Sequence, residues 1–86
     1  MMRNPLLGDR VRVLPHCPWA KGVTATVIGG LQGDRMKFRR VVPGDDGLRT
    51  FYFLAFDQPQ VDEKGDGPYI GGEIESHFIE LLPPPS

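Results

Sequence analysis

The chain has 86 residues, of which 40% are hydrophobic and 24% are charged, and its formal net charge is −1. These values argue against disorder and leave no room for a second core. We therefore expect one domain over residues 1–86, with an ordered core at about 8–82. Eleven glycines and nine prolines imply many turns and few helices, which favours an all-β fold.

Localisation can be inferred from three features of the sequence. No apolar run approaches the ~20 residues needed to cross a bilayer. The N-terminal residues lack the apolar stretch of a secretion signal. Cys17 is the single cysteine, which excludes an internal disulfide and fits a reducing compartment. We expect a cytoplasmic protein that does not interact with membranes.

Apolar stretches bounded by Gly, Pro and Asp predict six strands. We expect these strands at residues 10–14, 23–28, 36–42, 49–57, 69–75 and 78–82. Two prolines and a glycine make 15–22 a loop, and Pro43–Gly47 has the chemistry of a hairpin turn. A long polar loop follows at 58–68, Gly71-Gly72 indicates a bulge or sharp bend, and 75–77 predicts one turn of 3₁₀ helix.

The most apolar of these stretches, R-T-F-Y-F-L-A-F-D, is predicted to be the central strand. Tyr52, Leu54 and Phe56 share one face, whereas Phe51 and Phe53 share the other. Because both faces are apolar, we expect the second face to be covered by the chain or by a partner. Curling into a small barrel would remove the exposed edges of such short strands. The expected core residues are Val11, Val13, Val23, Ala25, Val27, Leu54, Phe56, Ile74, Ile79 and Leu81.

Four segments in this order resemble the strands of SH3-like barrels. They are G-D-R-V-R-V at 8–13, G-V-T-A-T-V at 22–27, Y-F-L-A-F-D at 52–57, and the segment from Glu73-Ile74 to Glu80-Leu81. The spacing is similar to an electron-transport accessory branch. That branch holds the photosystem I reaction-centre subunit IV, the ferredoxin–thioredoxin reductase variable chain and the nitrile hydratase β subunit. Trp19 before Lys21-Gly22 resembles the loop tryptophan of the photosystem subunit.

The resemblance implies a small SH3-like barrel of five to six strands, with an added hairpin around residues 36–57. It also implies that the protein is an accessory subunit of a larger assembly. The match covers mainly core and turn positions, so it is specific for fold rather than for function.

Basic residues concentrate in the first half of the chain. Residues 1–49 hold nine Lys or Arg against four Asp or Glu, and residues 50–86 hold one against seven. Antiparallel pairing could cancel this asymmetry, or a basic patch could survive on one face. The densest basic cluster comprises Arg35, Lys37, Arg39 and Arg40, with Arg49 across the turn. An extended strand would place alternate cations about 7 Å apart, so a nucleic acid is an alternative ligand.

A protein partner or a second copy of the chain is the favoured ligand. Phe51 and Phe53 on the outer side of the central strand would form an apolar contact surface, together with the basic stretch Arg35–Arg40. Trp19 lies in a loop where SH3-like barrels often receive ligands, although it could equally be packed. We predict a non-catalytic protein-binding or self-associating module.

Chemistry at a metal or a nucleophile is not expected. The segment from Asp62 to Glu73 resembles a calcium-loop pattern, but Lys64 occupies a ligand position and Pro68 interrupts the pattern. Adjacent His16 and Cys17 are poorly disposed for joint ligation, and nothing orients a Cys–His pair for catalysis. We therefore predict no cofactor, no metal and no enzyme activity.

Overall fold

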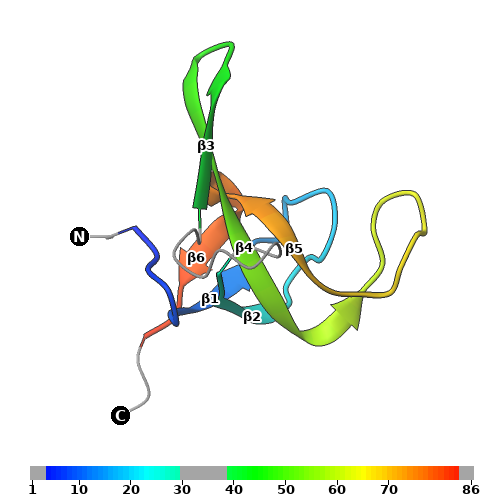
Figure 1. Cartoon of the computed structure of the whole chain (residues 1–86). Helices are drawn as coiled ribbons and strands as arrows, with labels where there is room; N and C mark the ends of the chain where they lie inside the picture. The colour runs from blue at the N-terminus through cyan, green and yellow to red at the C-terminus, as the bar shows by residue number, and fades with distance from the viewer. Residues whose placement is uncertain (1–3, 30–38, 84–86) are drawn as a thin grey trace.

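The computed structural model describes residues 4–29 and 39–83 of the chain, and these form a curled antiparallel sheet with one short 3₁₀ helix (Figure 1). The elements are β1 (Arg10–Val13), β2 (Thr24–Val27), β3 (Arg39–Gly44), β4 (Gly47–Gln60), β5 (Tyr69–Glu75), η1 (Ser76–Phe78) and β6 (Ile79–Leu81). The all-β prediction is confirmed, and the sheet has the form expected of a small barrel.

β4 organises the sheet. The strand order is β3-β4-β2-β1-β6, and β5 also pairs with β4. Leu54 illustrates this central position, because it pairs with Val27 of β2 and with Gly72 of β5. β4 is long enough to pair with three neighbouring strands along its length. The prediction that this apolar stretch is the central strand is therefore confirmed.

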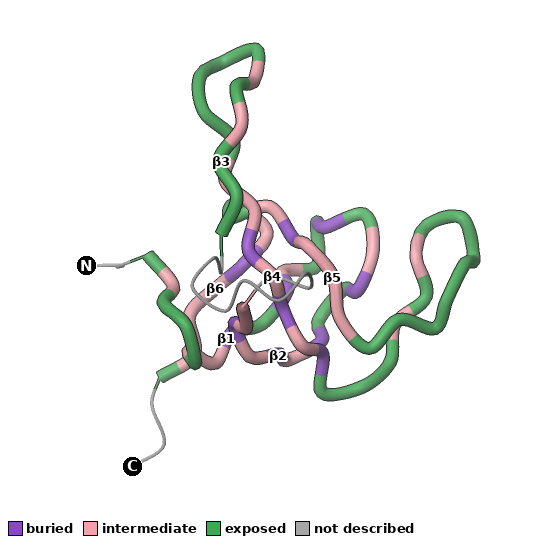
Figure 2. The backbone as a smooth tube through the Cα atoms, in the orientation of Figure 1, coloured by how far each residue is buried: buried purple, intermediate pink, exposed green. Residues whose placement is uncertain are grey.

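Apolar side chains alternate inward along β1, β2 and β4, as a half-buried sheet requires. Burial concentrates where these strands meet and falls off in the hairpin and in the loop before β5 (Figure 2). The buried core comprises Val11, Val13, Cys17, Ala20, Val23, Ala25, Val27, Tyr52, Leu54, Phe56, Ile74 and Ile79.

Three core residues were absent from the predicted set, and one predicted residue is only partly buried. Cys17 and Ala20 come from the loop after β1, which packs against the barrel in a way that strand periodicity cannot show. Tyr52 is buried because it shares the inner face of β4 with Leu54. Leu81 lies in the last strand and packs only against the margin of the core.

The turn of the β3–β4 hairpin is shorter than the predicted Pro43–Gly47. The two strands pair from Arg39 with Tyr52 out to Gly44 with Gly47, so the turn is only Asp45-Asp46. Proline is tolerated within β3 because β3 ends the strand order of the described sheet, and an edge strand need not donate every backbone hydrogen bond. The hairpin stands away from the rest of the sheet (Figure 1). Residues 36–38, predicted to begin this strand, lie outside the described residues.

The register of β4 against β5 changes close to the predicted bend at Gly71-Gly72. The pairing runs regularly to Ala55 with Gly71 and resumes only at Gln60 with Tyr69. A side chain on Gly71 would meet the backbone oxygen of Leu54 at 2.6 Å, so glycine permits the close approach of the two strands.

Candidate functional site

Trp19 lies in the loop between β1 and β2, where one part of its indole packs on the core. Its ring meets the ring of Phe56 edge-on, with 5.4 Å between centroids. A Cβ atom on Gly72 of β5 would lie 2.9 Å from Cη2 of the indole, so the ring can pack here only because Gly72 has no side chain. Trp19 is only partly buried, and the rest of its surface faces an open groove.

The groove separates the Trp19 loop from the acidic loop before β5. Its volume is about 540 Å³, within the range of ligand sites in proteins. Tyr69 stands across from the indole, with 6.1 Å between ring centroids and planes at 80°. The residues that line this Trp19 groove are Trp19, Asp62, Glu63, Lys64, Asp66, Tyr69, Gly71 and Gly72.

Asp62 shapes the acidic wall of the groove. Its Oδ1 accepts hydrogen bonds from the backbone nitrogens of Lys64 at 3.0 Å and Asp66 at 2.8 Å. The backbone closes the same turn, since the Asp62 nitrogen donates to the Asp66 oxygen and the Gly65 nitrogen donates to the Asp62 oxygen. This carboxylate therefore folds the loop, as an Asx turn does.

The predicted basic cluster meets acidic residues of β5 on the outer face of the sheet. Arg40 forms a two-pronged ion pair with Glu73, at 2.7 and 3.2 Å. Arg49 binds Glu75 in the same way, at 2.8 and 3.2 Å. The contact with Arg49 lowers the pKa of the Glu75 carboxyl, mainly through the hydrogen bond that Arg49 donates. Antiparallel pairing thus cancels part of the charge asymmetry seen in the sequence.

Phe51 lies beneath these two arginines. The guanidinium carbons of Arg40 and Arg49 are 4.8 and 5.0 Å from its ring centroid, within cation–π range. Phe51 and Phe53 are each partly buried on the side of β4 opposite the core. For Phe51, the cover comes from the hairpin of the same chain.

The remaining residues predicted to bind a partner fall in different places. Arg39 begins β3 and is exposed. Arg35 and Lys37 lie outside the described residues. The structure brings Arg40 and Phe51 together, but it places Trp19 at a separate groove next to β5. Roles for all of these residues in partner binding stay predictions.

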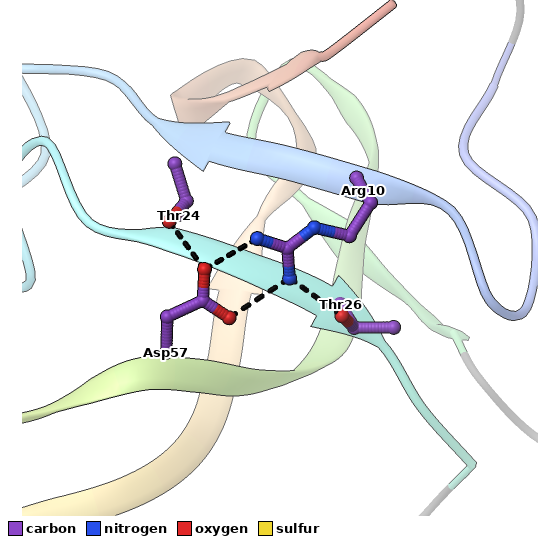
Figure 3. A network of polar contacts seen from close by, with 4 residues as sticks. All are labelled: Arg10, Thr24, Thr26 and Asp57. Atoms are coloured by element: carbon purple, nitrogen blue, oxygen red, sulfur yellow. Dashed lines mark hydrogen bonds and ion pairs between the residues drawn. The ribbon is translucent and has the colours of Figure 1, made fainter. Parts of the chain in front are cut away.

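A second polar cluster joins three strands near the end of the barrel (Figure 3). Arg10 of β1 binds Asp57 of β4 through both ends of its guanidinium group. It also donates to the Thr26 hydroxyl at 2.8 Å, and the Thr24 hydroxyl donates to Oδ2 of Asp57, the oxygen that also accepts from Nη2 of Arg10. The hydrogen bond from Arg10 is the main reason that the pKa of Asp57 is lowered to about 2. The polar groups of this cluster bind one another, so we interpret the cluster as a structural clamp between the three strands.

Cys17 and His16, which precede Trp19 in the same loop, contact other residues of the chain. Burial raises the pKa of the Cys17 thiol, which makes it a poor nucleophile at neutral pH. His16 and His77 stack with 6.1 Å between centroids, next to Phe78. Within residues 4–29 and 39–83, no group of three or more His, Cys, Asp or Glu side chains could hold a metal ion.

The sequence interpretation identified Trp19 but missed the other side of its groove. Tyr69 was assigned only to a strand, and Glu63 and Asp66 were assigned to a polar loop whose likeness to a calcium site was set aside. A usable signal was present: an acid-rich turn directly precedes an aromatic residue and two glycines. The sequence pattern could not show that this segment, which follows β4, lies next to the loop after β1.

Comparison of the chain with protein-family models, with curated proteins and with solved structures finds no match. Within the described part of the chain, no helix has the length and apolar character needed to cross a membrane.

Proposed function

We propose that this chain is a non-catalytic protein-binding module that receives a segment of its partner in the Trp19 groove. The observation that carries the proposal is the double environment of Trp19. One side of the indole is fixed by Phe56 and Gly72, and the other opens on a volume of about 540 Å³. A rigid aromatic residue half seated in the core is typical of contact hot spots.

The outer face of the hairpin is a less suitable site for binding a partner. Arg40 and Arg49 already have carboxylate partners, and together they cover Phe51. Self-association through Phe51 and Phe53 would have to displace these contacts. Binding of a partner in the Trp19 groove requires no such rearrangement. An accessory subunit, as the SH3-like resemblance implies, would need this kind of docking site.

The first test is a peptide panel followed by amide chemical shifts. The panel contains ten-residue peptides of cationic, neutral and anionic sequence. We expect at least one of these peptides to shift the amide signals of Tyr69, Gly71 and Gly72. Tyr69→Ala should weaken binding of the responding peptide about tenfold or more, because the groove loses one aromatic wall.

Ile70→Ala is the matched control. Ile70 is the next residue of β5 and is 79% exposed, yet it does not line the groove. Its replacement should leave the affinity unchanged. If no peptide of the panel shifts the groove signals, or if Tyr69→Ala and Ile70→Ala behave alike, the proposed site is wrong.

A further inference from the structure

We propose that the Trp19 groove recognises a cationic side chain, an arginine or a lysine of the partner segment. This inference rests on the proposed function and specifies the chemistry of the ligand. Two independent features of the groove support it: an aromatic corner and an excess of negative charge that the described residues leave unpaired.

The aromatic corner is built by Trp19 and Tyr69. Their rings are nearly perpendicular, so a side chain entering the groove meets two π systems in different orientations. A guanidinium or ammonium group over the face of Trp or Tyr is attracted by the ring quadrupole when it lies within about 6 Å of the centroid. The aliphatic part of a Lys or Arg side chain gains from burial against the same rings.

The charge of the groove is negative. Asp62, Glu63 and Asp66 line it with three carboxylates, against the single ammonium group of Lys64. Asp62 uses its carboxylate to close the loop, which leaves Glu63 and Asp66 for a ligand. Neither of these two side chains has a hydrogen bond or ion pair within the described residues.

Elsewhere in the second half of the chain, three of the four acidic residues have cationic partners, and Glu80 has none among the described residues. Asp57 binds Arg10, Glu73 binds Arg40, and Glu75 binds Arg49. The groove therefore differs from these three ion-paired sites. Its two available carboxylates lie beside exposed aromatic surface, where a cation from outside the chain would complete the pairing. An anionic segment would be repelled, and a purely apolar one would leave the carboxylates without a partner.

The test uses the only tryptophan of the chain as a reporter within the groove itself. We would titrate the full chain with capped seven-residue Gly-Ser peptides that differ only at the central residue: Arg, Lys, Gln or Glu. The Arg and Lys peptides should change Trp19 emission and bind at least about tenfold more tightly than the Gln peptide. The Glu peptide should be the weakest.

A charge-matched pair of variants locates the effect. Glu63→Gln combined with Asp66→Asn should weaken binding of the Arg peptide about tenfold and reduce its dependence on salt. Asp45→Asn combined with Asp46→Asn removes the same charge from the hairpin turn and should leave binding unchanged. All four positions are exposed, so both double variants should fold.

The outcomes separate the two proposals. Equal binding of the Arg and Gln peptides, or equal effects of the two double variants, would overturn the preference for a cation while leaving the groove as a docking site. If no peptide of either panel perturbs Trp19 or its neighbours, both the ligand class and the proposed function are overturned.

Discussion

At the scale of single residues, the fold depends on side chains that connect strands far apart in the sequence. Arg10 and Asp57 are separated by 47 positions, yet they join β1 to β4 across β2. Their chemistry alone gives no hint of this pairing. Asp57 was predicted only as the last residue of an apolar strand, and its partner only as a polar residue of an alternating one. The pair became visible once the strands had been placed next to one another.

The clamp predicts a specific acid sensitivity. Because the pKa of Asp57 is about 2 in the folded chain, against 3.8 for an unperturbed carboxyl, its contribution to stability is complete above about pH 4. It should be lost as the pH falls through 2. Asp57→Asn should lower stability at neutral pH and flatten the fall between pH 4 and 2. Urea unfolding followed by Trp19 emission at several pH values would measure this.

Asp46→Asn in the hairpin turn is a suitable control, because this exposed residue has no ion pair or side-chain hydrogen bond among the described residues. Its stability curve should run parallel to that of the parent chain. Parallel curves for Asp57→Asn as well would mean that the clamp does not contribute to stability.

Gly72 shows how one residue connects fold to site. The pair Gly71-Gly72 was interpreted as a bend in a strand, and a change of register does begin at Gly71. The second glycine has a different role, since the indole of Trp19 occupies the space where its side chain would be. A strand glycine often marks such a close approach, but the sequence does not say which group approaches.

At the scale of elements, β4 divides into a buried part and a projecting part. Leu54 lies at the centre of the strand with no exposed surface, whereas Leu48 lies near the hairpin turn and is 77% exposed. The same strand thus offers two leucines in opposite environments. Substituting each leucine in turn therefore measures separately how much the barrel and the hairpin contribute to stability.

This contrast yields a prediction about stability. Leu54→Ala should lower the free energy of unfolding by about 2–5 kcal/mol, because it removes buried apolar contacts and leaves a cavity. Leu48→Ala should change it by less than about 0.5 kcal/mol, because that side chain is already largely in water. Chemical denaturation of the two variants gives both values. A large loss from Leu48→Ala would show that the hairpin is packed against something in solution.

At the scale of the whole molecule, the basic and acidic halves of the chain are interleaved by the sheet. β3 and the start of β4 bring arginines, and β5 brings the carboxylates that neutralise them. A nucleic acid would have to compete with Glu73 and Glu75 for the same guanidinium groups. These ion pairs therefore support our proposal of a protein ligand over the nucleic-acid alternative.

Releasing the arginines should reverse this preference. Glu73→Gln combined with Glu75→Gln changes the formal net charge from −1 to +1 and frees Arg40 and Arg49. We expect weak binding of a labelled oligonucleotide by the parent chain and clearly stronger, salt-sensitive binding by this variant. Fluorescence anisotropy at low and moderate salt would measure both affinities.

Glu63→Gln combined with Glu80→Gln provides the control, since it changes the net charge equally without touching either ion pair. It should raise the affinity for the oligonucleotide less. Tight, steeply salt-dependent binding by the parent chain would instead support the nucleic-acid alternative.

The sequence by itself determined the class of fold, the central strand and most of the core. Alternation of side chains, turn residues and a high content of Gly and Pro are local signals, and local signals set strands and turns. It also singled out Trp19, because the resemblance to SH3-like barrels places its loop where such barrels often receive ligands.

Only the tertiary structure decided which residues share a surface. It set Tyr69 beside Trp19, together with two carboxylates that no described residue pairs, and it placed Glu73 and Glu75 over the basic hairpin. The physical reason is that these contacts join segments whose proximity depends on the order and register of the strands. That order is decided by how all of the strands pack together, and no single stretch of sequence contains it.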